Sequence, residues 1–222
     1  MVSRSTEAAE SDYIEQQLEP RRRSSAGGFL VLHAALLERD GAVIALTGPS
    51  GIGKSTLSAG LQSLGWTLRG DDTMTLHGGK GAPSALALAS RLRLKADSAS
   101  AVGGGDNVSR GVDSFGKYVF DLPEADFPRP VKAFFLLDVS ADAEVGAERI
   151  GPSAACAVIV ANSFARDPAH LEEAGRRLAF AAEVAARVPL FRLRYPRDYG
   201  AIPDVAAEIA RTLEGQSPAE ET

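Results

Sequence analysis

The order of apolar and polar residues predicts an α/β fold that begins near residue 29. Residues 29–47 read as two apolar strands joined at Asp40-Gly41. This pair favours a two-residue hairpin, because both turn positions adopt positive φ. The second strand contains the uniformly apolar run AVIAL at 42–46, which is typical of a strand buried on both faces. We therefore expect a hairpin whose second strand lies inside a sheet.

A helix and a further strand are expected directly after this hairpin. The helix should run from about Ser55 to Leu64, because leucines recur at i, i+4 and i+7 along it. The strand WTLR follows at 66–69 and leads into Gly70-Asp71-Asp72. If this strand runs parallel to the one at 42–47, the two strands end at the same edge of the sheet.

The rest of the chain continues to alternate between strand and helix patterns. Residues 97–116 are rich in Gly, Ser and Asp and predict a mobile loop or lid. The remaining predicted elements are a hairpin or irregular β segment over 74–88, strands at 91–95, 117–122, 131–139 and 190–195, and helices at 167–189 and 202–213. Asp167 and Pro168 suit the start of the first of these helices.

Composition places the chain among ordinary globular proteins with one domain. Of its 222 residues, 45% are hydrophobic and 24% are charged, and the net charge is −5. We expect a flexible N-terminal arm over 1–27, one domain over 28–214 and a disordered tail over 215–222. The sequence has no obviously basic face that would suggest a nucleic-acid partner, and no apolar run long enough for a membrane span. Its single cysteine, Cys156, favours a cytoplasmic location.

The segment GPSGIGKS, residues 48–55, has the pattern of a phosphate-binding loop between a buried strand and a helix. Its glycines let backbone N–H groups turn toward phosphates, and the helix N-terminus adds a positive dipole end. The residues of this motif, Gly48, Pro49, Ser50, Gly51, Ile52, Gly53, Lys54 and Ser55, are expected to bind a nucleoside triphosphate. Lys54 is expected at the β- and γ-phosphates, and the Ser55 hydroxyl at Mg²⁺.

Asp71 and Asp72 are candidates for the chemistry at the γ-phosphate. One carboxylate can hold Mg²⁺ and the other can accept a proton from an attacking hydroxyl. The alternative is that one of them only caps a turn. If Asp40-Gly41 is a two-residue turn, His33 faces Gly48 across the hairpin. It could then orient an aspartate or contact a phosphate, or it could be a half-buried strand histidine.

These residues together resemble the catalytic domain of HPr kinase/phosphorylase: His33, TGPSGIGKST, a short helix and GDD. VPLFRLRYPRD, residues 188–198, is similar to the C-terminus of short HPr-kinase-related proteins. The same region is similar to the nucleotide-binding core of ATP-dependent phosphoenolpyruvate carboxykinase. The resemblance implies a P-loop kinase domain with a mixed sheet flanked by helices, ATP and Mg²⁺ as cofactors, and a homo-oligomer.

Carried over by position, the resemblance makes Gly48 to Thr56 the ATP-binding residues and Asp71 the catalytic base, with His33 beside them. It also implies that Asp72 helps to hold Mg²⁺, to which the motif already assigns Ser55. The chain departs from the family in lacking its N-terminal domain and its Glu-Ile-Arg-Gly-type segment. The chain also has no clear match to the family's Arg-containing loop, which is tied to the reverse phosphorylase reaction; IGPSAACAV, residues 150–158, stands roughly where that loop would lie. The resemblance therefore implies a kinase without the reverse reaction.

The acceptor stays open. The leading possibility is a serine of a protein or peptide, such as an HPr-like protein or a biosynthetic precursor peptide. A small molecule such as free serine is the second possibility, and a nucleotide-dependent switch or assembly factor is the third. Arg91, Arg93 and Lys95 share one strand face and could line an anionic acceptor site or remain solvated. Arg110 and Lys117 border the predicted lid and could close on the phosphates.

Overall fold

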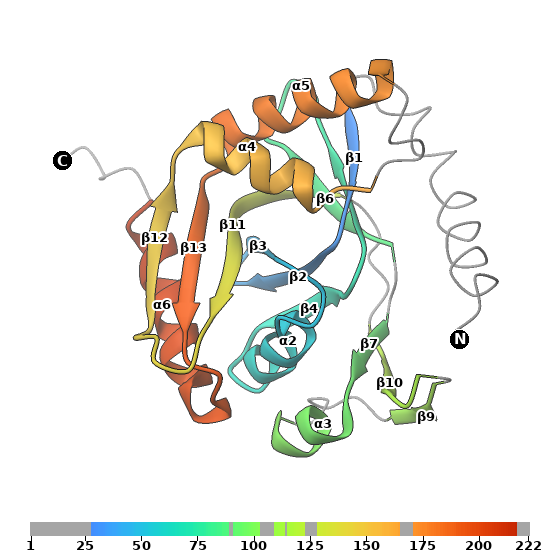
Figure 1. The fold of residues 1–222 in the computed structure, drawn as a ribbon, viewed down its shortest axis with the longest axis vertical. Helices are drawn as coiled ribbons and strands as arrows, with labels where there is room; N and C mark the ends of the chain where they lie inside the picture. Colours follow the sequence, from blue (N-terminus) through green and yellow to red (C-terminus); the bar gives the residue numbers. More distant parts are fainter. Residues whose placement is uncertain are drawn as a thin grey trace.

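The computed structural model describes residues 28–88, 91–102, 109–113, 115–122, 128–164 and 171–216, without the side chains of 102, 109 and 110. The predicted arm, the tail beyond residue 216, and Asp167 and Pro168 lie outside the described residues. Within them, the fold is a mixed sheet flanked by helices, as the sequence predicts (Figure 1). No helix in the described ranges has both the length and the apolar character needed to cross a membrane.

The main sheet has nine strands in the order β1-β5-β6-β11-β3-β2-β4, and β13 pairs with β11 while β12 pairs with β13. Its strands are β1 (Phe29–Leu32), β2 (Ala34–Arg39), β3 (Ala42–Thr47), β4 (Thr67–Gly70), β5 (Met74–His77), β6 (Ser84–Ala87), β11 (Arg129–Val139), β12 (Gly146–Ile150) and β13 (Leu190–Tyr195). β3, β11 and β13 run parallel, and the other pairs are antiparallel. The sheet is therefore mixed.

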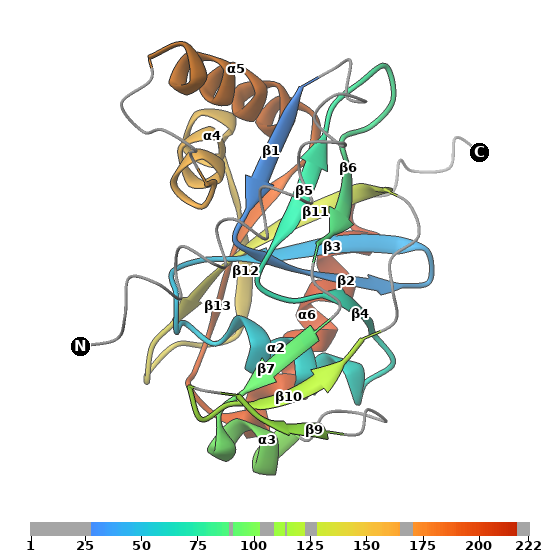
Figure 2. The same ribbon diagram turned by 90° about the vertical axis from the view of Figure 1, so that its right-hand side faces the viewer.

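Helices cover both faces of this sheet (Figure 2). α2 (Lys54–Gln62) and α6 (Ile202–Glu214) pack on one face, and α4 (Pro152–Ala161) and α5 (Leu171–Arg187) pack on the other. Alternate residues of the central strands point to opposite faces. Ile44 and Leu46 therefore enter the core below α2, while Val43 and Ala45 enter the core below α4 and α5.

A second sheet of three strands, in the order β7-β10-β9, lies beside α2. Its strands are β7 (Arg91–Leu94), β9 (Ser109–Val112) and β10 (Tyr118–Asp121), and α3 (Ala96–Val102) follows β7. Leu92, Leu94 and Phe120 attach this sheet to the core on the α2 side. The small sheet therefore borders the region where α2 begins.

The predicted hairpin forms with the expected register, since Arg39 pairs with Ala42 and both turn residues have positive φ, 51° at Asp40 and 77° at Gly41. The predicted hairpin over 74–88 also forms, as β5 and β6. The prediction of a loop over 97–116 was wrong in part, because α3 covers 96–102 and β9 covers 109–112. β12 and α4 have no counterpart among the predicted elements.

The first predicted strand is also divided, because β1 ends at Leu32 and β2 begins at Ala34. His33 stands at the break, and its N–H donates to the Asn162 carbonyl at 2.8 Å instead of joining the hairpin ladder. The break redirects the chain, so that β1 pairs with β5 while β2 pairs with β3 and β4. His33 consequently lies where two parts of the sheet diverge.

Candidate functional site

The glycine-rich segment 48–53 connects the buried strand β3 to the first residue of α2. Gly48, Gly51 and Gly53 have φ values of 144°, 79° and 118°, which other residues adopt only with strain. The backbone can therefore fold tightly around the N-terminus of α2, where the first N–H groups have no partner inside the helix. This arrangement presents backbone donors and a positive dipole end, which suits an anion.

Lys54 is the first residue of α2, and its side chain folds back over the loop. Its Nζ donates to the carbonyls of Gly48 at 2.8 Å and Pro49 at 3.1 Å. The residue is only 5% exposed. Burial lowers the pKa of Lys54, and the nearby charges of Asp71 and Asp72 oppose that change. The loop therefore holds a buried amine close to two carboxylates.

β4 brings these two carboxylates to the same edge of the sheet as the loop. β4 and β3 are both antiparallel to β2, which lies between them, so the two strands point the same way and end together. Asp72 has φ 69°, and the N–H of Thr73 donates to the Asp71 carbonyl at 2.9 Å. This pair of features defines a γ-turn with positive φ, a rare and strained conformation. Such strain costs on the order of 1–3 kcal/mol and tends to occur at functional sites.

Asp71 is a buried carboxylate without an ordinary hydrogen bond. It is 1% exposed, and neither of its carboxylate oxygens has a hydrogen-bond partner. Burial, with a further contribution from Asp72, raises its pKa from 3.8 to about 6. The Ser55 hydroxyl and the backbone N–H groups of Asp72 and Arg93 oppose this rise. These groups lie close enough to stabilise the negative charge of the Asp71 carboxylate, although none forms a hydrogen bond of ordinary geometry with it. Asp71 is thus free to accept a proton or to ligate a cation.

Asp72 and His33 are tied together beside the loop. The Asp72 carboxylate pairs with Arg93 of β7 at 2.7 Å, and both side chains are about one-third exposed. His33 Nδ1 lies 2.8 Å from the Asp72 carbonyl oxygen. Because that oxygen can only accept, Nδ1 carries the proton. Burial and the charge of Lys54 lower the pKa of His33, which favours a neutral ring with a free lone pair on Nε2.

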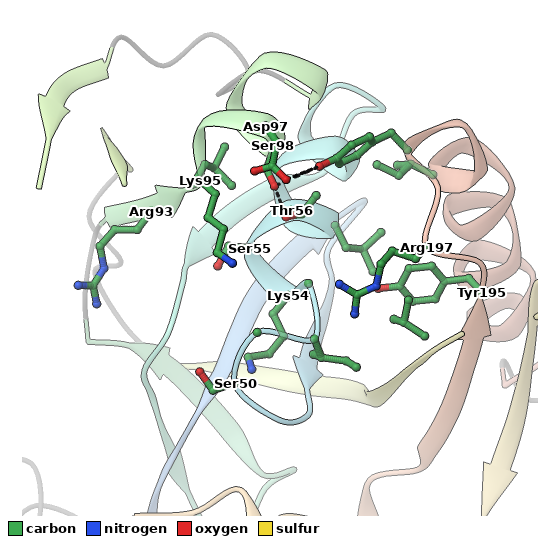
Figure 3. A pocket seen from close by; sticks show the side chains of 18 of the residues that line it. Ser50, Lys54, Ser55, Thr56, Arg93, Lys95, Asp97, Ser98, Tyr195 and Arg197 are labelled. Atoms are coloured by element: carbon green, nitrogen blue, oxygen red, sulfur yellow. Dashed lines mark hydrogen bonds between the residues drawn. The ribbon is translucent and has the colours of Figure 1, made fainter. Parts of the chain in front are cut away.

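A cleft with a volume of about 270 Å³ runs along the loop and the start of α2 (Figure 3). It is lined by predicted site residues His33, Asp72 and 50–56, and also by Arg93, Lys95 and Lys117. Gly48 and Pro49 support the loop, and Asp71 is buried next to Asp72, so these three do not line the cleft. Arg91 is exposed and does not line it either, and the side chain of Arg110 lies outside the described residues.

The opposite wall of the cleft was not predicted to be functional. It consists of residues 195–199, at the end of β13, together with α3. Ser98 Oγ lies 2.9 Å from the Thr56 hydroxyl and 3.4 Å from the Tyr199 hydroxyl. The Tyr199 hydroxyl also donates to the Asp97 carboxylate at 3.5 Å. Two sequence signals touched this wall: the segment 188–198, which carried part of the family resemblance without an assigned role, and the predicted lid at 97–116, which includes Asp97 and Ser98.

Magnesium fits the residues at this edge of the sheet. Mg²⁺ in proteins is usually held by one or two carboxylates, phosphate oxygens and waters. Asp71 offers two unpartnered buried oxygens, and the Ser55 hydroxyl and Asp72 lie beside it. In the part of the chain that the structure describes, no cluster of three or more His, Cys, Asp or Glu forms a metal site.

No protein-family model matches the sequence, and no curated protein matches it. Among solved structures, the chain is similar to the Hpr(Ser) kinase/phosphatase from Coxiella burnetii, with 13% sequence identity and a TM-score of 0.45. The match covers 85% of this chain and 99% of that chain. A similarity this distant does not indicate an activity.

Proposed function

We propose that this protein is an ATP-dependent kinase that transfers the γ-phosphate to a serine hydroxyl of a protein or peptide. The observation that carries the proposal is the Asp71 carboxylate. It is buried, lacks hydrogen-bond partners, and lies at the same sheet edge as a glycine-rich loop with a lysine folded over it. A purely structural role would leave both carboxylate oxygens unsatisfied at a considerable cost in stability.

The loop and α2 would bind the triphosphate of ATP. Backbone N–H groups of residues 50–55 and the dipole of α2 would hold the β- and γ-phosphates, and Lys54 would leave the Gly48 and Pro49 carbonyls to neutralise them. Ser55 and Asp72 would hold Mg²⁺, which would neutralise charge on the bridging phosphates when bound. The glycine conformations and the proximity of Ser55 to Asp71, the neighbour of Asp72, support these roles.

Asp71 would act as the general base. Its carboxylate would take the proton of the serine hydroxyl while the hydroxyl oxygen bonds to the γ-phosphorus. The bond from that phosphorus to the β–γ bridging oxygen then breaks, and ADP leaves. The pKa of about 6 supports this role, because the carboxylate is ionised near neutral pH yet more basic than an ordinary aspartate. Asp72 is less suited to the role, because its carboxylate is held by Arg93.

The acceptor is proposed as a serine in an HPr-like protein or a biosynthetic precursor peptide. Arg93, Lys95 and Lys117 line the cleft, and their charge also suits the alternative, a small-molecule acceptor such as free serine, whose carboxylate is negative. A nucleotide-dependent switch is less favoured, since a switch does not need a base beside the phosphate. A cytoplasmic location, a homo-oligomeric state, and the absence of nucleic-acid and membrane partners stay predictions from the sequence.

The test is to incubate the protein with Mg-ATP and candidate acceptors and to measure the mass of every species. The acceptors are an HPr-like protein, serine-containing peptides and free serine. Asp71→Asn should abolish the added phosphate, lowering the rate by about 10²–10⁴-fold. Asp40→Asn is the matched control, because Asp40 lies at the hairpin turn with a side chain that is 89% exposed.

A magnesium titration separates the two aspartates. Asp72→Asn should raise the Mg²⁺ concentration needed for half-maximal transfer, whereas Asp71→Asn should lower the rate at every Mg²⁺ concentration. The reversed pattern would assign the base to Asp72 and the metal to Asp71. ATP binding without a mass gain on any acceptor would count against the kinase and favour a switch.

A further inference from the structure

The order of strands gives the cleft two different ends. The sheet order β4-β2-β3-β11-β13 places the loop after β3 between Asp71 and Asp72, which follow β4, and residues 195–199, which follow β13. At about 4.8 Å between neighbouring strands, the ends of β4 and β13 are roughly 19 Å apart. In Figure 3, Arg93, which pairs with Asp72, lies on one side of Lys54, and Tyr195 and Arg197 lie on the other.

The two ends also differ in chemistry. The end near β4 carries His33, Asp72, Arg93 and Lys117, all polar. The end near β13 combines apolar and polar groups. Its apolar members include Val139, Ile202 and the rings of Tyr195 and Tyr199, and its polar members include Asp97 and Ser98. An apolar pocket with a few polar groups is typical of a site for a flat organic ligand.

We infer that the end near β13 binds the nucleoside of ATP, with its base packed against the ring of Tyr199. This inference rests on the proposed function, because the γ-phosphate must lie at the end that holds Asp71. The nucleoside must then extend the other way, past the start of α2. Tyr199 remains 40% exposed although its hydroxyl is engaged by Ser98 and Asp97. Tyr199 therefore lines the cleft and is partly open to solvent.

The network around Ser98 gives this end a defined shape. Thr56 of α2, Ser98 of α3 and Tyr199 before α6 are linked by hydrogen bonds. The Ser98 residue itself is only 6% exposed. Because three separate elements meet there, the wall is held before any ligand arrives. A fixed wall lowers the entropic cost of binding.

The experiment compares MgATP, MgADP and magnesium tripolyphosphate as ligands in calorimetric titrations. Tripolyphosphate has the phosphate chain without the nucleoside. Tyr199→Ala should weaken ATP and ADP binding by about tenfold, because the base would lose its stacking on an aromatic ring. Its affinity for tripolyphosphate should not change. Tyr199→Phe keeps the ring and should keep ATP affinity within about twofold, well below the stacking effect.

Tyr118→Ala is the matched control, because Tyr118 is 38% exposed and does not line the cleft. Unchanged ATP affinity in Tyr199→Ala would overturn the inference and leave the proposed kinase intact. Equal losses for ATP and tripolyphosphate would also overturn it, because the effect would then come from the phosphate site. A wild-type protein that binds none of the three ligands would overturn the proposed function itself.

A measurement on the wild-type protein guards against a variant that does not fold. Hydrogen–deuterium exchange should slow at residues 96–102 and 195–202 with MgADP but not with magnesium tripolyphosphate. Both ligands should slow exchange at residues 50–57. Equal protection of 195–202 by the two ligands would contradict a nucleoside site there.

Discussion

At the scale of single residues, Asp71 links stability to pH. The pKa of Asp71 is about 6 in the folded protein, whereas its ordinary value is 3.8. Between pH 3.8 and pH 6 the folded state therefore keeps a proton on Asp71 that the unfolded state has lost. The contribution of protonated Asp71 to the free energy of unfolding is complete below pH 3.8 and is lost as the pH rises through about 6. At neutral pH the ionised group therefore destabilises the fold.

Asp71→Asn should consequently stabilise the ligand-free protein at pH 7.5. We expect the free energy of unfolding to rise by about 1–2 kcal/mol, less than the full shift, because Lys54 loses a favourable neighbouring charge. Urea denaturation at pH 7.5 and pH 4.5 measures this, and the gain should shrink at the lower pH. A variant less stable than wild type at pH 7.5 would mean that the carboxylate has a structural partner.

His33 is expected to position Asp72 through the proton on Nδ1. Asparagine can place an amide nitrogen close to the position of Nδ1, so His33→Asn should keep the bond to the Asp72 carbonyl and retain most of the transfer rate. His33→Ala should lose the bond and lower the rate by about tenfold, the effect of removing one hydrogen bond of about 1 kcal/mol or more. Steady-state kinetics of both variants decides the role. Equal losses in both would instead assign acid–base chemistry to Nε2.

At the scale of elements, two helical glycines are expected to respond in opposite ways to alanine. A Cβ on Gly60 of α2 would come within 2.6 Å of the Ile202 side chain of α6, whereas a Cβ on Gly175 of α5 would meet nothing within 4 Å. Gly60→Ala should therefore destabilise the protein by about 1–3 kcal/mol. Gly175→Ala should stabilise it by about 0.5–1 kcal/mol through helix propensity. Chemical denaturation of both variants measures the difference.

The same pair separates packing from function. Ile202 lines the cleft as well as packing on Gly60, so Gly60→Ala should also weaken ATP binding. Gly175→Ala should leave ATP binding unchanged, because α5 lies on the opposite face of the sheet. A stabilised Gly60→Ala variant would show that α6 moves easily away from α2.

Elements with strong local signals were predictable from sequence, and those formed by distant pairing were not. Asp40-Gly41 sets its own turn, and the glycines of 48–53 set their own loop, so the hairpin register and the loop geometry could be predicted. α4 is apolar all along its length, SAACAVIVA at 153–161, and so lacks the one-sided pattern of a surface helix. The cleft wall at 195–199 reaches the loop only through the parallel pairing of β13 with β11, which leaves no local pattern.

At the scale of the whole molecule, ligand binding should be linked to global stability. Residues from His33 to Ile202 line the cleft, and they come from both sheets and from α2, α3 and α6. Unfolding of any of these parts would dismantle the site, so the ligand should bind only the folded state. At a ligand concentration of 100 times Kd, the fold should gain about 2.7 kcal/mol.

Thermal unfolding with MgATP at that concentration should therefore show a Tm about 5–10 °C higher than without ligand, at roughly 2–4 °C per kcal/mol for a domain of this size. Lys54→Ala should lose most of this increase, and so should chelation of the magnesium by EDTA, because both leave phosphate charge without compensation. A Tm that rises equally with and without magnesium would mean that the carboxylates at Asp71 and Asp72 do not share a cation with the phosphates. A Tm that ATP does not change would mean that the protein does not bind ATP, because a ligand that contacts so many elements of the fold must stabilise them when it binds.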